Sequence, residues 1–196
     1  MGTLPAAKPA GGAGIASTGT MVLMVGLPSC GKSTTSRAIT PPDGVRIEFD
    51  EFFYTQVGSN PNSYDWSRTL LPEARRWNYR RIVDAVDARI DPIVIDSDNG
   101  LYPYTASYVS YAVDRGYEIE LREPDSPWWS AVRRLLEDPQ RNAVALEKWV
   151  NKLAFMSRRM HRVPVETFRR RIATWKPDLS VQDVLNLPNT WSEIDD

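Results

Sequence analysis

A glycine-rich turn between an apolar run and a helix-forming segment constrains the fold of this chain more than any other feature. Residues 21–25 (MVLMV) form the short apolar run of a buried strand, and residues 26–33 read GLPSCGKS. The segment from Lys32 to Ile39 favours a helix, which the following pair of prolines ends. The spacing G-x-x-x-x-G-K-S, with a strand before it and a helix after it, matches the phosphate-binding loop at every fixed position.

The residue types in this turn indicate what it binds. Glycines let the backbone fold so that its N–H groups point at an anion, and the helix N-terminus adds its dipole. Lys32 is expected to reach the β- and γ-phosphates of a nucleoside triphosphate, and the Ser33 hydroxyl to ligate Mg²⁺. The predicted nucleotide-binding residues are Gly26, Leu27, Pro28, Ser29, Cys30, Gly31, Lys32, Ser33 and Thr34.

Beyond this turn, strand-like and helix-like segments alternate. Residues 45–49, 92–95 and 117–121 are short apolar or alternating runs that predict three further strands. The helix-like segments are 72–89, 102–115 and the long stretch 127–175. This alternation predicts an α/β protein with the P-loop NTPase fold: a mostly parallel sheet flanked by helices, a helical lid and a C-terminal helical segment.

The two ends of the chain differ in composition from the middle. Residues 1–20 are mostly small residues and proline, without a basic start before an apolar run, so we expect a flexible tail and no secretory signal. Residues 176–196 contain two prolines and five acidic residues, which predicts an acidic tail lying over the surface. The predicted kinase domain is therefore 21–175.

Length and composition exclude several classes of protein. The 196 residues are enough for one domain with a sizeable core. No apolar run approaches the roughly 20 residues of a membrane-spanning helix, so we expect no membrane partner. Cys30 is the single cysteine, which excludes an intramolecular disulfide and fits a reducing compartment such as the cytoplasm. No feature of the sequence indicates its oligomeric state.

The formal net charge of −1 conceals an uneven distribution along the chain. Residues 133–176 contain twelve Lys and Arg against four Asp and Glu. Such a concentration of positive charge is typical of a surface that meets phosphates. Solvated helix faces explain the same asymmetry equally well.

The motifs of other nucleotide-binding classes are missing. The guanine motif N-K-x-D is absent, since the Asn151-Lys152 pair is followed by Leu-Ala, and a D-x-x-G switch element is absent too. Residues 95–99 read IDSDN, without the adjacent catalytic glutamate typical of motor and assembly ATPases. These exclusions favour ATP as the nucleotide and a small phosphotransferase as the class of enzyme.

A kinase that phosphorylates a hydroxyl needs a carboxylate beside the acceptor to take its proton. Asp50 and Glu51 follow the second predicted strand, so they leave the sheet at the same edge as the phosphate loop. We predict that Asp50 is the general base and that Glu51 contacts the substrate. The alternative interpretation is that these carboxylates only cap a turn.

The third predicted strand ends in further polar residues at this edge. Asp96 is expected to help hold Mg²⁺ together with Ser33, or to orient the acceptor. Asn99 is predicted to bond the substrate.

Phosphoryl transfer also needs positive charge over the moving phosphate. Arg133, Arg134 and Arg141 flank residues 137–140, a break between helical segments that suits a lid. Arg141 is the predicted lid arginine because it lies at the far end of this break. A solvated loop between helices is the alternative for each of the three.

In their order along the chain, several segments resemble one group, the polynucleotide-kinase-like P-loop kinases, which are relatives of the zeta toxins. The segments are the phosphate loop, DEFF at 50–53, YDW at 64–66, ARRWN at 74–78, PIVID at 92–96 with Asn99, and REPD at 122–125. The resemblance covers residues 21–175. The group includes 5′-hydroxyl polynucleotide kinases and phage enzymes that phosphorylate hydroxymethyl groups on DNA bases, such as 5-hydroxymethyluracil.

The resemblance implies roles for individual residues. Lys32 and Ser33 would bind phosphate and Mg²⁺, Asp50 would be the general base, and an arginine near Arg141 would close over the phosphates. It also implies a bacterial cytosol or a phage-infected host as the location. One departure concerns the substrate: end-phosphorylating enzymes often have a basic residue after the acidic pair, whereas residues 52–54 here read FFY.

Aromatic residues after Asp50 are a further indication of the substrate. Phe53 and its neighbours are placed to stack on a nucleobase, although core packing is the ordinary explanation for such residues. The cluster consists of Phe52, Phe53, Tyr54, Tyr64 and Trp66. Together with the basic segment, it favours a nucleic acid, DNA in particular, over a free small molecule.

Three other residues carry little functional signal by themselves. Cys30 is interpreted as a small neutral filler of the loop. Trp128 is equally consistent with helix packing and with base contact. His161, the single histidine, is predicted at a partly exposed helix position and not in a metal site.

The sequence therefore predicts an ATP- and Mg²⁺-dependent kinase that transfers the γ-phosphate to a hydroxyl on a nucleic acid. The acceptor is either a 5′-terminal hydroxyl or a hydroxymethyl group on a DNA base. Two alternatives stay open: a kinase for a metabolite, nucleotide sugar or antibiotic, and a nucleotide-binding module without catalytic activity.

Overall fold

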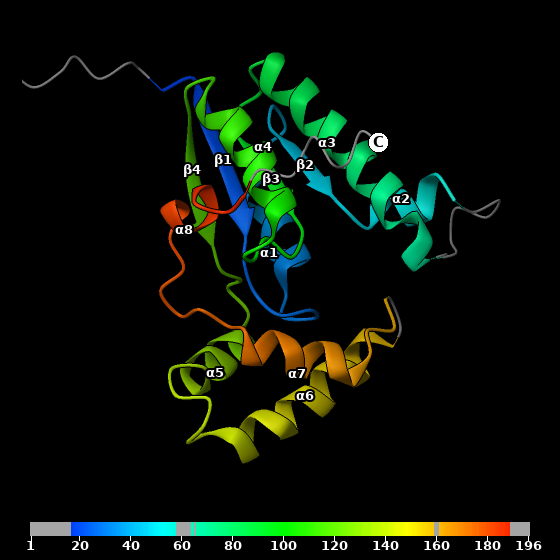
Figure 1. The fold of residues 1–196 in the computed structure, drawn as a ribbon, viewed down its shortest axis with the longest axis vertical. Coiled ribbons are helices and arrows are strands. Elements are labelled where there is room, and N and C mark those ends of the chain that lie inside the picture. Colours follow the sequence, from blue (N-terminus) through cyan, green and yellow to red (C-terminus); the bar gives the residue numbers. More distant parts are fainter. Residues whose placement is uncertain (1–16, 58–63, 65, 159–160, 189–196) are drawn as a thin grey trace, which may run out of the picture.

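The computed structural model describes residues 17–57, 64, 66–158 and 161–188. Within them lies a four-stranded sheet in the order β2-β3-β1-β4 (Figure 1). Every pairing between neighbouring strands is parallel, which confirms the predicted α/β class. The strands are β1 (Gly19–Met24), β2 (Val45–Glu48), β3 (Ile93–Asp96) and β4 (Tyr117–Arg122).

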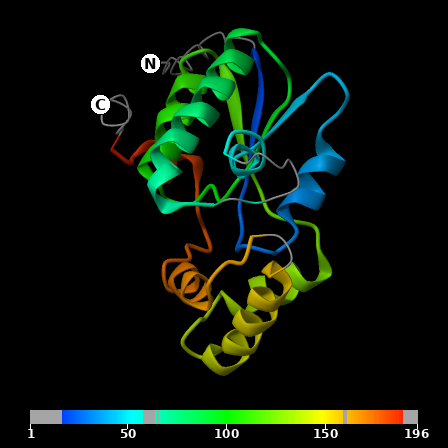
Figure 2. The same cartoon turned by 90° about the vertical axis from the view of Figure 1, so that its right-hand side faces the viewer.

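Helices cover both faces of this sheet (Figure 2). On β1, Met21 and Leu23 pack into a cluster with buried side chains of α3 and α4, whereas Val22 and Met24 pack with Ile39 of α1 on the other face. Successive strand side chains point to opposite faces, so an apolar run with no polar alternation requires helices on both sides. The helices are α1 (Lys32–Ile39), α2 (Glu51–Thr55), α3 (Leu71–Asp87) and α4 (Pro103–Val113).

The segment predicted to be helical from residue 127 forms a separate layer beyond one end of the sheet (Figure 1). It consists of α5 (Pro127–Leu135), α6 (Ala143–Ser157) and α7 (Val165–Ala173). These helices share a core in which Trp129, Leu153 and Phe168 are buried, and Leu27 and Cys30 of the phosphate loop belong to the same cluster. The phosphate loop therefore rests on the helical layer as well as on the sheet.

The ends of the predicted domain differ from the structure. β1 begins at Gly19, inside the expected N-terminal tail, and the Thr20 N–H donates to the Asp91 carboxylate (2.9 Å). The expected surface tail contains α8 (Val181–Leu185), whose Val184 is fully buried in the cluster shared with α4 and β4. Besides Val184, Leu179 and Leu185 pack on this cluster and a capping box starts the helix, but five residues show no periodicity that would have revealed it. Residues 1–16 and 189–196 of the expected tails lie outside the described residues.

No helix within the described ranges is both long and apolar enough to cross a membrane.

Candidate functional site

The phosphate loop has the backbone that its glycines were expected to permit. Gly26 and Gly31 have φ values of +149° and +103°, which favour glycine over residues with a side chain. A Cβ on Gly26 would lie 2.7 Å from the Cys30 Sγ, and a Cβ on Gly31 would lie 3.0 Å from the Ser126 Cβ. Both positions therefore exclude other residues on steric grounds as well as on backbone grounds.

The helical layer supports this loop from outside. The Ser126 hydroxyl donates to the Cys30 carbonyl (2.6 Å), and the Trp128 indole N–H donates to the Ser29 carbonyl (3.1 Å). Trp128 thus packs on the phosphate loop itself, an arrangement that neither of its two interpretations had named. These contacts bond the carbonyls of Ser29 and Cys30 from outside the loop, as expected of a loop whose amides bind an anion.

Lys32 lies across the loop. Its ammonium donates to the carbonyls of Gly26 (3.0 Å) and Leu27 (2.9 Å). An ammonium has three N–H donors, so the group that closes the loop still has one donor for a phosphate oxygen.

Ser33 and Asp96 meet as the sequence predicted. The Ser33 hydroxyl donates to Oδ1 of Asp96 (3.3 Å), and the Ser36 hydroxyl donates to Oδ2 (2.8 Å). Arg46 forms an ion pair with the same Oδ2 (2.5 Å) and a second one with Glu48 (2.8 Å). These two carboxylates outweigh the effect of burial and raise the pKa of the Arg46 guanidinium above its ordinary value.

The oxygen atoms of Ser33 and Asp96 suit Mg²⁺. Mg²⁺ prefers hard oxygen ligands and is usually held by one or two protein groups together with phosphate oxygens and water. No group of three or more metal-binding side chains occurs within the described ranges, so the protein does not form a complete cage there. The donor set fits a metal that arrives with a nucleotide.

Asp50 lies at the same edge of the sheet. Glu48, the last residue of β2, is in register with Asp96 of β3, and the Phe49 N–H donates to the Asp96 carbonyl (3.4 Å). Because β3 separates β2 from β1, the end of β2 lies about two strand spacings, roughly 10 Å, from the strand that leads into the phosphate loop. This is the edge at which open parallel sheets bind ligands.

The Asp50 side chain does not cap the helix that it precedes. The structure records no capping hydrogen bond from this side chain to α2, and 42% of the side chain is exposed. Its Oδ1 instead accepts from the Tyr64 hydroxyl (3.0 Å). Burial, and then the nearby Asp50 charge, raise the pKa of the Tyr64 hydroxyl, which therefore stays a donor to this carboxylate. The interpretation of Asp50 as a simple helix cap is not supported.

Two predicted substrate residues are wrong. Asn99 is fully buried: its amide donates to the carbonyls of Met24 (2.8 Å) and Ile95 (2.9 Å), and its carbonyl accepts from Tyr108 (2.6 Å). It ties the end of β1 to the end of β3 and is not exposed to a substrate. Phe53 is only 2% exposed and packs edge-on against Phe52, so it cannot stack on a base.

Glu51, the third predicted substrate residue, lies on α2. Its carboxylate accepts from the Arg81 guanidinium of α3 (2.7 Å) while its side chain stays partly exposed. A substrate role for Glu51 therefore stays a prediction.

The predicted lid arginine lies in an unexpected place. Arg141 belongs to the connection between α5 and α6, which lies at the end of the helical layer away from the phosphate loop (Figures 1 and 2). Its backbone N–H donates to the Asp138 carboxylate (3.0 Å), as in an ordinary loop turn. This position gives no support to Arg141 as the residue that closes over the phosphates.

Another arginine of the helical layer reaches the sheet edge. Arg171 of α7 forms an ion pair with Asp98, just beyond β3, and lies 4.4 Å from the centroid of the Tyr102 ring. Burial, partly offset by Lys32, raises the pKa of the Cys30 thiol, and Asp98 adds to this rise. Because β3 pairs with β1, Asp98 follows β3 at the edge of the sheet where β1 leads into the phosphate loop, and its ion pair holds Arg171 at the same edge.

His161 is the second residue that sequence reasoning missed. It lies in a turn after α6 and not on a helix, and its Nδ1 is 3.5 Å from Oδ2 of Asp50. Nothing in its local sequence indicated this contact, because the two residues are far apart along the chain.

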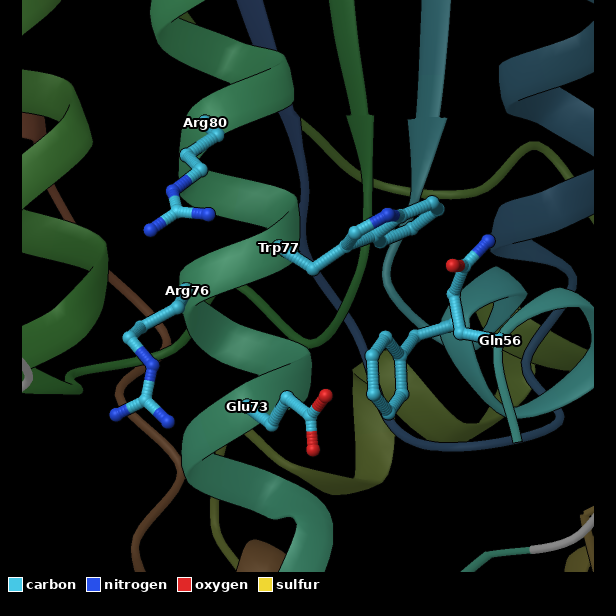
Figure 3. Close-up of a pocket in the computed structure, with 6 residues that line it drawn as sticks. Gln56, Glu73, Arg76, Trp77 and Arg80 are labelled. Atoms are coloured by element: carbon cyan, nitrogen blue, oxygen red, sulfur yellow. The ribbon is translucent and has the colours of Figure 1, made fainter.

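A pocket of about 280 Å³ lies between α2 and α3. Figure 3 shows Trp77 turned toward α2, with Arg76 and Arg80 on the other side of α3. The lining residues are Phe52, Gln56, Glu73, Arg76, Trp77 and Arg80. The pocket combines aromatic side chains from α2 (Phe52) and α3 (Trp77) with arginines of α3, next to the helix that Asp50 precedes.

Comparison with known proteins agrees with this architecture. The family model described as an AAA domain matches residues 21–163. The human NEDD4-binding protein 2 is 31% identical over 140 residues, which are 70% of this chain and 8% of that protein. The chain therefore corresponds to a small part of that relative.

A solved structure shares the fold. A chain of the Pnkp1/Rnl/Hen1 RNA repair complex superposes with a TM-score of 0.52 and 15% sequence identity, over 81% of this chain and 44% of that one. At this identity, the likeness concerns the fold alone.

Proposed function

This chain belongs to the AAA domain family, and we propose that it is an ATP- and Mg²⁺-dependent kinase that phosphorylates a hydroxyl group on a nucleic acid. One observation carries the proposal: Asp50 is a partly exposed carboxylate, not used as a helix cap, at the sheet edge that also holds Ser33 and Asp96. The catalytic glutamate that motor and assembly ATPases carry directly after the metal-binding aspartate is absent after Asp96, whereas Asp50 lies at the end of the neighbouring strand, where an acceptor can reach it.

Each group of residues in the site would have its own role in phosphoryl transfer. Lys32 and the loop amides would bind the β- and γ-phosphates and offset their charge. Mg²⁺, held through Ser33 and Asp96, would supply further charge neutralisation between those phosphates. Asp50 would accept the proton of the acceptor hydroxyl as its oxygen bonds to the γ-phosphorus. The bond from that phosphorus to the β–γ bridging oxygen would break, and ADP would leave.

Three observations support a nucleic acid as the acceptor. The basic residues of 133–176 lie mainly on the helical layer, next to the sheet edge. The pocket beside α2 is lined by Trp77, whose ring can contact a base, and by Arg80, which can contact a phosphate. The fold neighbour comes from an RNA repair complex. A DNA acceptor, with a 5′-hydroxyl or a hydroxymethyl base, is the expectation we carry forward from the sequence.

A small-molecule kinase is the second candidate. The burial of Phe52 and Phe53 favours it, because it removes two of the aromatic residues that were expected to stack on a base.

The test is label transfer from γ-labelled ATP to a panel of acceptors. The panel comprises 5′-hydroxyl DNA, 5′-hydroxyl RNA, DNA containing 5-hydroxymethyluracil, and free nucleosides. We expect labelled DNA with the wild-type protein, no transfer with Lys32→Ala, and a kcat about 10²- to 10⁴-fold lower with Asp50→Asn at nearly unchanged ATP affinity. Asp43→Asn, at an exposed aspartate before β2, is the matched control.

The outcomes separate the candidates. Label only on nucleosides would favour the small-molecule kinase. Full transfer by Asp50→Asn would contradict the assignment of the base. ATP binding with no labelled acceptor would favour the non-catalytic module.

A further inference from the structure

The Asp50 carboxylate is approached from both sides. The Tyr64 hydroxyl donates to Oδ1 (3.0 Å), and His161 brings Nδ1 to 3.5 Å from Oδ2. The His161 ring stands edge-on to the Tyr64 ring, with centroids 5.0 Å apart and an interplanar angle of 80°. A second ring, that of Tyr54, lies 6.5 Å from the imidazole. Two rings of the sheet domain thus frame a histidine from the helical layer.

The imidazole has an unused polar atom. Nδ1 of His161 is buried and has no hydrogen-bond partner among the residues that the structure describes. Buried polar atoms are almost always paired, so an unpaired one calls for an explanation. The nearest carboxylate oxygen, at 3.5 Å, is only a few tenths of an ångström beyond the usual limit of about 3.2 Å for an N–H···O bond.

The backbone holds this histidine in a defined place. After α6, the N–H groups of His161 (3.0 Å) and Arg162 (2.8 Å) both donate to the Ser157 carbonyl. Arg162 has a left-handed φ of +49°, and the buried Ser157 hydroxyl accepts from the Val163 N–H (3.1 Å). These bonds tie the backbone of His161 and Arg162 to the last residue of α6. The imidazole is therefore presented from a fixed point beside the end of α6.

We propose that His161 is a positioning residue for the general base, so that the helical layer completes the site at Asp50. When the imidazole moves toward Asp50 by a few tenths of an ångström, the His161 Nδ1–H donates to Oδ2 while Tyr64 donates to Oδ1. With both oxygens held, a free lone pair of the carboxylate is aimed at the acceptor hydroxyl. The inference rests on the proposed kinase function.

The first experiment uses the fact that His161 is the single histidine of the chain, so that one imidazole gives the side-chain signals. Asp50→Asn is expected to shift the ¹⁵N and ¹H resonances of that imidazole in an NMR spectrum. Asp43→Asn, the matched control, is expected to leave them unchanged. An imidazole that does not respond to Asp50→Asn would overturn the contact, whatever the enzyme's activity.

The second experiment measures catalysis in His161 variants. His161→Leu is expected to lower kcat about 10- to 100-fold with less than a twofold change in the KM for ATP, as for other residues that orient a catalytic group. His161→Asn keeps an N–H donor near the position of Nδ1 and should restore most of kcat. In an Asp50→Asn background, His161→Leu should have no further effect, because the two residues act as a unit.

The outcomes distinguish this inference from the proposed function. Equal losses in His161→Leu and His161→Asn, accompanied by a lower melting temperature, would identify a merely structural residue. Full kcat in His161→Leu, with an active wild-type protein, would overturn the positioning role alone. No label transfer by the wild-type protein would overturn the kinase function and the role of His161 with it.

Discussion

The ends of β2 and β3 place two aspartates at one edge of the sheet, in very different surroundings. Asp96, the last residue of β3, has a side chain only 3% exposed and is bonded by two hydroxyls and the Arg46 guanidinium. Asp50, two residues after β2, is 42% exposed, and among the described residues its hydrogen bond comes from Tyr64. Asp96 is in register with Glu48 and is covered by α1 and by Arg46 of β2, whereas Asp50 lies beyond the end of its strand.

The difference in exposure and bonding between Asp96 and Asp50 suits the two carboxylates to different roles. A carboxylate that accepts several short bonds is held rigidly and can orient a metal or its ligands. A carboxylate that takes up a proton during each turnover needs access to substrate and few competing donors. The β3 end is therefore suited to holding the nucleotide and its metal, and the β2 end to chemistry on the acceptor.

The largest expected effect is the difference in stability between two single variants, Asp96→Asn and Asp50→Asn. Asp96→Asn should lower the free energy of unfolding by about 2 kcal/mol, because the partly buried Arg46 loses one of its two carboxylate partners. Asp50→Asn should change it by less than about 0.5 kcal/mol, as at an exposed site. Urea denaturation of both variants measures these changes in the free energy of unfolding. Equal stabilities would remove the distinction between the two strand ends.

The next effect concerns the polar residue that closes the β3 end. Asn99→Ala should lower the free energy of unfolding by about 2 kcal/mol, since it leaves the carbonyls of Met24 and Ile95 and the Tyr108 hydroxyl without their buried partner. Thermal unfolding monitored by circular dichroism checks the stability. The acceptor KM of the folded fraction should stay the same; a raised KM would return Asn99 to a role in substrate binding.

The smallest expected effect is on kcat/KM for ATP, and it tests which arginine of the helical layer acts at the edge of the sheet. Arg171→Gln should lower kcat/KM for ATP about tenfold, because it removes positive charge from the β3 end beside the phosphate loop. Arg141→Gln, in the distant α5–α6 connection, should change it less than twofold. Steady-state kinetics of the two variants measure the contrast. A larger loss in Arg141→Gln would restore the lid role that the sequence predicted.

Sequence reasoning succeeded where the interactions are local. The phosphate loop, α1 and the four strands were predicted within one to three residues, because their signals lie in consecutive apolar, glycine and proline residues. The meeting of Ser33 with Asp96 was predicted too, since parallel strands bring their carboxyl ends to one edge. The short helices α2 and α8 were missed because five residues carry too little periodicity.

The sequence by itself determined that this chain forms a parallel α/β domain with a loop shaped for a triphosphate. Only the tertiary structure decided which polar residues at the sheet edge stay accessible. In the tertiary structure Asn99 is buried between two strands, Phe53 packs into a core, and His161 and Arg171 reach the site from the distant helical layer. The physical reason is that a local pattern specifies backbone conformation, whereas exposure and partnership depend on contacts between segments far apart in the chain.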